Sequence, residues 1–307
     1  MNTMQQSHNN VTRHNLLKAL GALGITTGLP MSPALAAAGS DKRILVVVEM
    51  SGANDGLNTL VPYTEDAYYR LRPRIGLRAD NVRKIDDRYG FNPGMLGFER
   101  LYKDGKMAIV HGCGYPQQSL SHFQSMGYWH TGVPNGGERF GWLGRVADAI
   151  DPQLTPNFLV NIDERQSLAV HSEHHVPVVF DDPERFTRKG LLQSRVLLDY
   201  PTVTDGPNLS RNYLDKVAAS AREASTLVRA AWGSYKTPVD YGIRSLDLNK
   251  VAAMINAGLP SQLFYVSFRH NAFDTHVHQN AQHGRLLSFA SDAIAGFMRD
   301  MERIGRA

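Results

Sequence analysis

Cysteine is almost absent from this sequence, in which Cys113 is the single example among 307 residues. One thiol cannot form a disulfide within its own chain, so a packed core must stabilise the fold. The length is sufficient, because about 270 residues remain after the N-terminal segment described below and can form one large domain. We expect Cys113 to pack as a small apolar residue beside a strand at 107–110, and not to act as a nucleophile.

Long apolar runs are also missing, since no stretch reaches the roughly 20 residues that a membrane-spanning helix needs. The run at 16–29 is shorter and rich in glycine and alanine, and the three alanines at 36–38 offer a small-x-small cleavage site. Residues 1–38 are therefore expected to be an export signal; 12–18 resembles a twin-arginine signal with His14 in place of the second arginine. A membrane-anchoring helix is the alternative. The mature protein is expected to be periplasmic or otherwise exported, with no transmembrane segment.

The net charge of the chain is also small. The chain has 33 lysine and arginine residues against 29 acidic ones, and removing residues 1–38 takes away Arg13 and Lys18, which leaves 31 against 29. No basic cluster with interleaved aromatic residues is present. Nucleic acid is therefore not expected as a partner.

The pattern of apolar residues favours an α/β fold. Short apolar runs alternate with longer segments of helical periodicity, and the β-branched run at 44–48 is typical of a central parallel strand buried on both faces. Further strands are expected at 107–111, 158–162, 176–180 and 263–268, helices at 67–72, 92–103, 183–200, 208–235, 245–257 and 283–305, and a loose connection at 200–209. Residues 39–307 are thus expected to form a single domain, a mostly parallel sheet flanked by helices on both faces.

The densest group of metal-ligating residue types follows the last expected strand. Asp274, His276, His278 and His283 lie close together in the sequence. Carboxylate oxygen and neutral imidazole nitrogen are donors that zinc and manganese accept, and alternate positions point the same way on an extended chain. The segment predicts a divalent metal site. The alternative is a polar turn that leads into a helix, with His283 facing solvent.

Two more polar loops follow expected strands, and ligands collect at the carboxyl ends of strands in an open parallel sheet. In the first loop Asp55 could bind a metal, or it could belong to an Asn-Asp-Gly turn shaped by local hydrogen bonds. In the second loop Ser119 or Ser121 could cap a helix. Ser121 could also attack a phosphoryl or sulfuryl group, because free amides at a helix N-terminus bind anions. His122 is a candidate ligand or acid/base, or a structural imidazole.

A second group of histidines contains His171, His174 and His175. It lies in a turn rich in serine and glutamate. We expect these three side chains to be solvated.

Taken together, several blocks resemble the exported bacterial family filed as domain of unknown function 1501. The blocks lie at 47–59, 62–63, 68–73, 111–123, 141–145 and 273–279, and the resemblance runs from about residue 44 to the end. That family is grouped with the alkaline phosphatase-like superfamily of phosphatases, sulfatases and phosphoglycerate mutases. The resemblance implies a parallel sheet flanked by helices and a two-metal hydrolase site.

By this resemblance Asp55 would bind one metal, Asp274 and His276 the other, and Ser121 would lie near the place of the nucleophile. His278 and His283 are further candidates. Members of the family continue past the helix that ends here near residue 305, into blocks that read Ser-Glu-Phe-Gly-Arg and Gly-Thr-Asp-His-Gly. The resemblance therefore implies that the chain is a fragment or a truncated member, whose metal site is incomplete and whose sheet could be incomplete too.

These observations lead to two hypotheses about function. The first is an exported metal-dependent hydrolase that acts on an anionic phosphate or sulfate ester. The second is a non-catalytic exported protein that keeps the fold and uses loops rich in tyrosine, tryptophan and glycine to bind a partner in the cell envelope, since a fold does not imply a function. The oligomeric state is left open.

Overall fold

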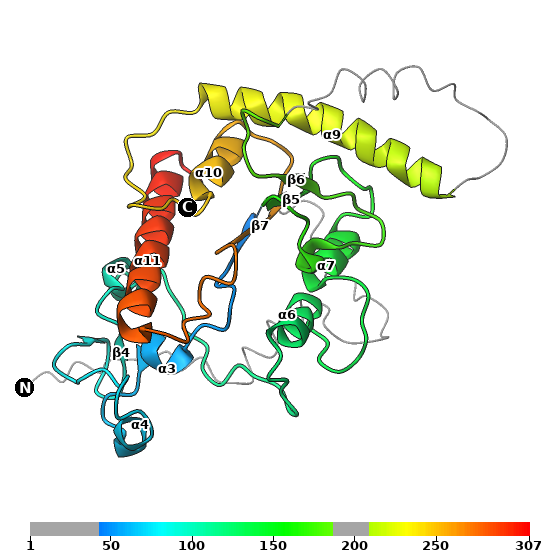
Figure 1. Cartoon of the computed structure of the whole chain (residues 1–307). Helices are drawn as coiled ribbons and strands as arrows, with labels where there is room; N and C mark the ends of the chain where they lie inside the picture. Colours follow the sequence, from blue (N-terminus) through cyan, green and yellow to red (C-terminus); the bar gives the residue numbers. More distant parts are fainter. Residues whose placement is uncertain (1–42, 187–208) are drawn as a thin grey trace, which may run out of the picture.

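The computed structural model describes residues 43–186 and 209–307 (Figure 1). The predicted export signal at 1–38, most of the helix expected at 183–200 and the loose connection at 200–209 lie outside the described residues. The other elements can be compared with the structure directly.

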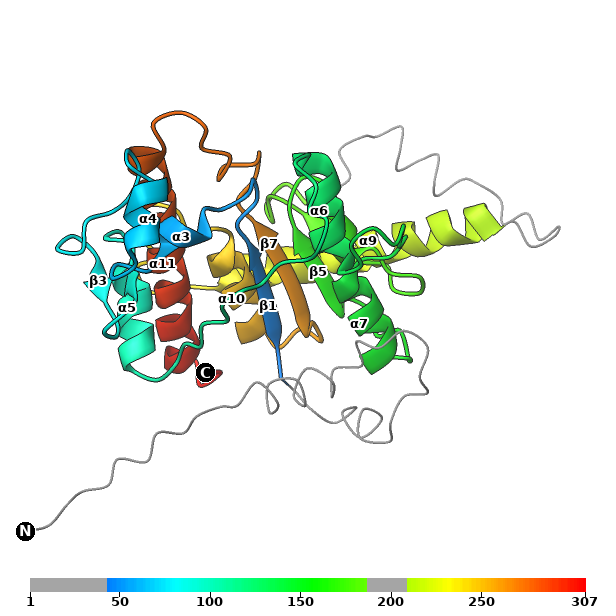
Figure 2. The ribbon, with the colours of Figure 1, turned by 90° about the horizontal axis from the view of Figure 1, so that it is seen from below.

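A parallel four-stranded sheet lies at the centre of the described chain, and it confirms the α/β prediction. Its order is β1 (Leu45–Glu49), β7 (Leu263–Ser267), β5 (Leu159–Ile162) and β6 (Val178–Phe180). The paired strands all run parallel, with Val47 opposite Tyr265 and Val160 opposite Phe264. Figure 2 shows β1, β7 and β5 side by side in the middle of the molecule.

Strand β7 shows how the sheet divides the core between its two faces. Phe264 and Val266 pack into a cluster with the helices α9 (Leu209–Ser234), α10 (Leu248–Asn256) and α11 (Gln279–Arg303). Leu263 and Tyr265 pack on the opposite face with α7 (Trp142–Ile150). This division follows from the alternation of side chains along a strand. The sheet is therefore covered by helices on both faces, as the sequence predicts.

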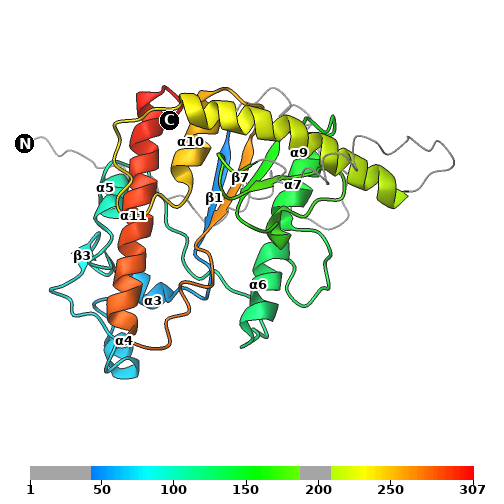
Figure 3. The ribbon, with the colours of Figure 1, turned by 45° about the horizontal axis from the view of Figure 1, so that its top comes forward.

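Figure 3 labels the α-helices of the described chain. They are α3 (Gly56–Thr59), α4 (Asp66–Leu71), α5 (Leu96–Lys103), α6 (His122–Thr131), α7, α9, α10 and α11. A short 3-10 helix, η2 (Leu168–Val170), follows β5. The helices expected at 67–72, 92–103, 208–235, 245–257 and 283–305 thus form within a few residues of their predicted bounds.

Strand β1 does not occupy the central position that its apolar run predicts. Within the described residues it pairs only with β7, so it lies at the edge of the sheet, and its side chains are mostly half-buried. The prediction of a central strand buried on both faces is wrong for this reason.

The strand expected at 107–111 does not form. In the described chain this segment has no strand structure, and its residues alternate between half-buried and exposed, with Met107 and Ile109 turned toward a core cluster. Cys113 follows it and is exposed, so the expectation of a buried, packed thiol is also wrong. Both differences have the same physical reason. The segment at 107–111 does not pair with the sheet, so Cys113, which follows it, is not packed against a strand and lies at the surface.

A small antiparallel sheet was not predicted. It contains β2 (Leu60–Val61), β4 (Gly90–Phe91) and β3 (Arg83–Lys84), in that order. Each strand has only two residues, which is too short for a periodic pattern to be recognised in the sequence.

Candidate functional site

The loops after β1 and β7 are held against each other at the end of the sheet where the strands terminate, which we call its carboxyl edge. Because the two strands are parallel neighbours, their carboxyl ends meet there, with Glu49 opposite Ser267. The backbone amide of Phe273 donates to the carbonyl of Ser51 at 2.9 Å, and the Ser51 hydroxyl donates to Asn271 Oδ1 at 3.1 Å. These contacts fix the position of the segment that carries Asp274.

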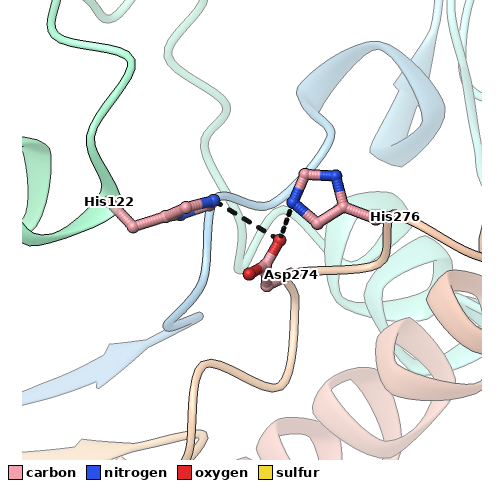
Figure 4. Close-up of side chains that lie close together, drawn as sticks. All are labelled: His122, Asp274 and His276. Atoms are coloured by element: carbon pink, nitrogen blue, oxygen red, sulfur yellow. Dashed lines mark ion pairs between the residues drawn. The ribbon is translucent and has the colours of Figure 1, made fainter.

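Three predicted residues come together at this edge, namely His122, Asp274 and His276 (Figure 4). His276 Nε2 lies 2.6 Å and His122 Nε2 lies 3.4 Å from Asp274 Oδ1. One donor atom from each residue lies within 4.8 Å of the other two. His122 is the first residue of α6, and the other two lie in the loop between β7 and α11. The sequence thus predicted all three residues, and the fold places them in one cluster.

The cluster fits a divalent cation in its donors and in part of its geometry. Two imidazoles and one carboxylate are donors that zinc and manganese accept. Ligands placed tetrahedrally at about 2.0 Å from zinc lie about 3.3 Å from one another, which agrees with the 3.4 Å between His122 and Asp274. The His276 contact is shorter and has the length of a hydrogen bond. Three protein ligands are also the usual number in catalytic zinc sites.

Asp55 lies outside this cluster in the described structure. Its carboxylate caps α3, forms an ion pair with Arg72 Nη1 at 2.6 Å and accepts a hydrogen bond from the Gln279 amide. Burial alone would raise the pKa of the Asp55 carboxyl, but the hydrogen bond and charge of Arg72 and the Gln279 amide outweigh it and lower the pKa. Asp55 is therefore ionised and paired with Arg72, and the local hydrogen bonds of the alternative interpretation are present. Its role as a ligand stays a prediction.

His278 and His283 also lie outside the cluster in the described part of the chain. His278 is exposed and precedes α11 in the left-handed region, with φ of 54°. His283 is 1% exposed, and its Nε2 lies 2.8 Å from Asn54 Oδ1. Burial lowers the pKa of His283, so its imidazole is neutral at neutral pH. The alternative interpretation, in which His283 faces solvent, is wrong, because His283 packs beneath the loop that follows β1. The role of His278 and His283 as ligands stays a prediction.

Ser121 is the N-cap residue of α6, as one of the two interpretations predicts. Its hydroxyl oxygen accepts a hydrogen bond from the backbone amide of Gln124 at 3.5 Å. Ser121 also directly precedes His122 in the sequence, so its hydroxyl belongs to the residue next to a candidate ligand. Its role as a nucleophile stays a prediction.

A second polar group at the same edge of the sheet was missed. It consists of Glu49 at the end of β1, Tyr265 on β7 and His130 on α6. His130 Nε2 lies 3.1 Å from Glu49 Oε2, and the Tyr265 hydroxyl donates to the same oxygen. The one signal in the sequence is a lone carboxylate directly after the apolar run at 45–48.

This group lines a pocket of about 370 Å³. Its walls are formed by Val47, Glu49, Met50, Gly52, Ala53, Asn54, Met126, Trp129, His130, Trp142 and Tyr265. Burial would raise the pKa of the Glu49 carboxyl, but hydrogen bonds from His130 and Tyr265 outweigh it and lower the pKa. Burial and the charge of Glu49 raise the pKa of the Tyr265 hydroxyl, which therefore stays protonated and donates. Glu49 is an anion at neutral pH.

The histidines at 171–175 do not form a uniformly solvated turn. His174 is exposed, but His175 is buried between two carboxylates, with Nδ1 2.9 Å from Asp148 Oδ1 and Nε2 3.1 Å from Asp151 Oδ2. The prediction that His175 is solvated is wrong. Both acids lie at the end of α7 or just after it, so a short-range pattern in the turn itself does not reveal them.

We expect His175→Ala to lower the free energy of unfolding by about 1–3 kcal/mol at pH 7, since the half-buried Asp148 and the buried Asp151 each lose one polar partner. Burial would raise the pKa of Asp148, but hydrogen bonds from His175 and Ser172 outweigh it and lower the pKa. A carboxyl group whose pKa is lower in the folded than in the unfolded protein stabilises the fold at pH values above its unfolded pKa. This stabilisation is lost as the pH falls through the folded pKa. The gap between the variant and wild type should therefore shrink below pH 3.8, the usual pKa of this side chain.

Urea denaturation of both proteins across this pH range measures the gap. His174→Ala, at the exposed neighbouring position, is the matched control and should stay within about 0.5 kcal/mol of wild type. A gap that is independent of pH would show that the loss comes from packing alone.

Comparison of the chain with protein-family models, with curated proteins and with solved structures gives no match. The resemblance to the exported family therefore stays a prediction. In the described residues, no helix combines the length and the apolar character needed to cross a membrane.

Proposed function

We propose that this chain is an exported, metal-dependent hydrolase-like protein that acts on a phosphate or sulfate ester, with a divalent cation held by His122, Asp274 and His276. The observation that carries the proposal is the convergence of these three donors at the carboxyl edge of a parallel sheet. The export signal predicted at 1–38 supports a periplasmic location.

The chemistry follows from the types of residue at this edge. A bound divalent cation would polarise an ester oxygen and stabilise negative charge on it. Asp274 lies between the two imidazoles, with one carboxylate oxygen near a ring nitrogen of each. The N-terminus of α6 carries free amides beside His122, which favours an anionic ester at this place. Ser121 directly precedes His122 and is the candidate nucleophile; its hydroxyl oxygen accepts from the Gln124 amide. Attack by this hydroxyl would release its proton to water and expel the alcohol of the ester.

A non-catalytic binding protein is the second candidate. The observation that favours it is the pocket beside Glu49, where Trp129 and Trp142 offer aromatic surface without any need for a metal. Metal binding without hydrolysis would support this candidate over the first.

We expect Asp274→Asn, His122→Ala and His276→Ala each to weaken binding of Zn²⁺ or Mn²⁺ by at least about 10- to 100-fold, since loss of even an indirect metal contact has an effect of that size. Isothermal titration calorimetry of the purified proteins measures the affinities. Hydrolysis of nitrophenyl phosphate and nitrophenyl sulfate should fall in parallel.

His174→Ala is the control for these variants, because His174 is an exposed histidine outside the cluster. It should leave both metal binding and hydrolysis unchanged. Thermal melting in the presence of a chelator separates ligand loss from misfolding, since a variant that only lacks a ligand should then match wild type. Full metal affinity in the Asp274→Asn variant would overturn the metal proposal.

A further inference from the structure

The pocket beside Glu49 combines one carboxylate with aromatic and apolar walls. Glu49 remains partly accessible, with 22% of its side chain exposed. Trp129, Trp142 and Tyr265 contribute rings, and methionine side chains contribute further apolar surface. The volume of about 370 Å³ lies within the range of about 300–1,000 Å³ that is typical of small-molecule sites.

The lining of this pocket has one carboxylate, that of Glu49, and in the described chain it includes no lysine and no arginine. An anionic ligand would therefore face a carboxylate without a lysine or arginine to pair with it, which disfavours such a ligand. An uncharged apolar ligand would remove water from Glu49 without replacing its hydrogen bonds, which is costly.

The aromatic walls favour the opposite charge. Trp129 is 56% exposed, and it lines the same pocket as the Glu49 carboxylate. Cations bind over aromatic faces, and tryptophan is the best partner for them. A carboxylate and indole rings around one small pocket are the groups that recognise a substituted ammonium ion.

We propose that this pocket binds a small organic cation, an alkylammonium group whose charge faces Glu49 and whose alkyl substituents contact Trp129 and Trp142. The site uses neither His122 nor Asp274 nor His276, so it does not depend on the proposed metal function. The loop after β1 contributes Gly52 and Asn54 to its wall.

The test compares choline with its uncharged isostere dimethylbutanol, in which a carbon atom replaces the quaternary nitrogen. Binding to the full chain is measured by tryptophan fluorescence and calorimetry at neutral pH with a chelator present. Two of the three tryptophans line the pocket, whereas Trp232 lies on α9 with its indole N–H near Glu184. Trp232→Phe therefore removes a remote signal and should leave binding unchanged.

We expect choline to bind about tenfold more tightly than dimethylbutanol, and Glu49→Gln to abolish this preference. Trp129→Leu, at a largely exposed position, should weaken choline binding about fivefold and keep the wild-type melting temperature. It provides a second test if Glu49→Gln does not fold. Equal affinities for the two probes, an unchanged affinity in Trp129→Leu, or no saturable binding up to about 10 mM would overturn the proposal.

Discussion

Replacing Asp300 with alanine should lower the free energy of unfolding by about 3–5 kcal/mol, the largest effect that we expect from a single side chain in this fold. The carboxylate of Asp300 is fully buried in the last turns of α11. It accepts hydrogen bonds from the Tyr235 hydroxyl, from the Tyr241 hydroxyl at 2.7 Å and from Thr237 Oγ1 at 2.9 Å, and it pairs with Arg303 Nε at 2.7 Å.

The effect is large because one group satisfies several buried partners. Tyr235 and Tyr241 are also buried, so removal of Asp300 leaves their hydroxyls without acceptors. The same contacts attach the connection between α9 and α10 to α11. Loss of Asp300 is therefore expected to loosen the helical layer on that face of the sheet, and hydrogen exchange should show this as faster exchange in α9 and α10.

Asp292→Ala is the matched control, because Asp292 lies on the same helix and is exposed. It should change the free energy of unfolding by no more than about 0.5 kcal/mol. Burial would raise the pKa of Asp300, but its hydrogen bonds outweigh burial and lower the pKa. The stabilisation should thus be present at neutral pH and be lost as the pH falls below 3.8, the usual pKa. Denaturation curves in which both variants are equally stable would contradict the assignment.

The elements that could be predicted are those whose own residues carry the signal. Strand β7 and helices α10 and α11 have apolar residues at the spacing that their burial requires, and the caps and turns around them are local. Strand β1 has the same signal as a central strand, but its position depends on which strands pair with it. Pairing is a long-range property that a run of apolar residues does not specify.

The sequence could predict the candidate residues of the metal site, but it could not predict which of these candidates lie together. Asp274 and His276 are neighbours in sequence, and His122 joins them only because α6 begins at the edge where β7 ends. Asp55 and His283 have the same chemistry, yet Arg72 and Asn54 pair with them. Which partner a polar side chain finds is decided by tertiary packing, so residue type alone cannot distinguish a ligand from a structural group.

The pocket beside Glu49 was missed for a related reason. Glu49, His130 and Tyr265 come from β1, α6 and β7, and none of them stands out in the sequence as a candidate site residue. In the sequence, Tyr265 has the pattern of an ordinary core residue of a strand, and His130 has that of an ordinary residue of a helix. Only the parallel pairing of β1 with β7 places Tyr265 beside Glu49.

The second large effect is expected at Gly52, where alanine should lower the free energy of unfolding by about 2–4 kcal/mol and weaken metal binding as well. Gly52 has φ of 105°, and an added Cβ would lie 2.5 Å from the carbonyl oxygen of Asn271 and 2.7 Å from the amide nitrogen of Asp274. These are backbone atoms, so the loop itself must move. The movement would displace Asp274 from His122, and calorimetry with Zn²⁺ should detect the loss.

Two glycine controls separate the causes of this effect. Gly56 is the first residue of α3, directly after the same loop; it has no positive φ and no atom within 4 Å of an added Cβ, so Gly56→Ala should change neither stability nor metal affinity. Gly105 has φ of 70° and the same open surroundings, so Gly105→Ala should cost only the strain of its conformation, about 1 kcal/mol. If Gly52→Ala were no more harmful than Gly105→Ala, close packing of the two loops could not be what positions Asp274. A larger loss at Gly52, accompanied by weaker Zn²⁺ binding, is the result that the contact between these loops predicts.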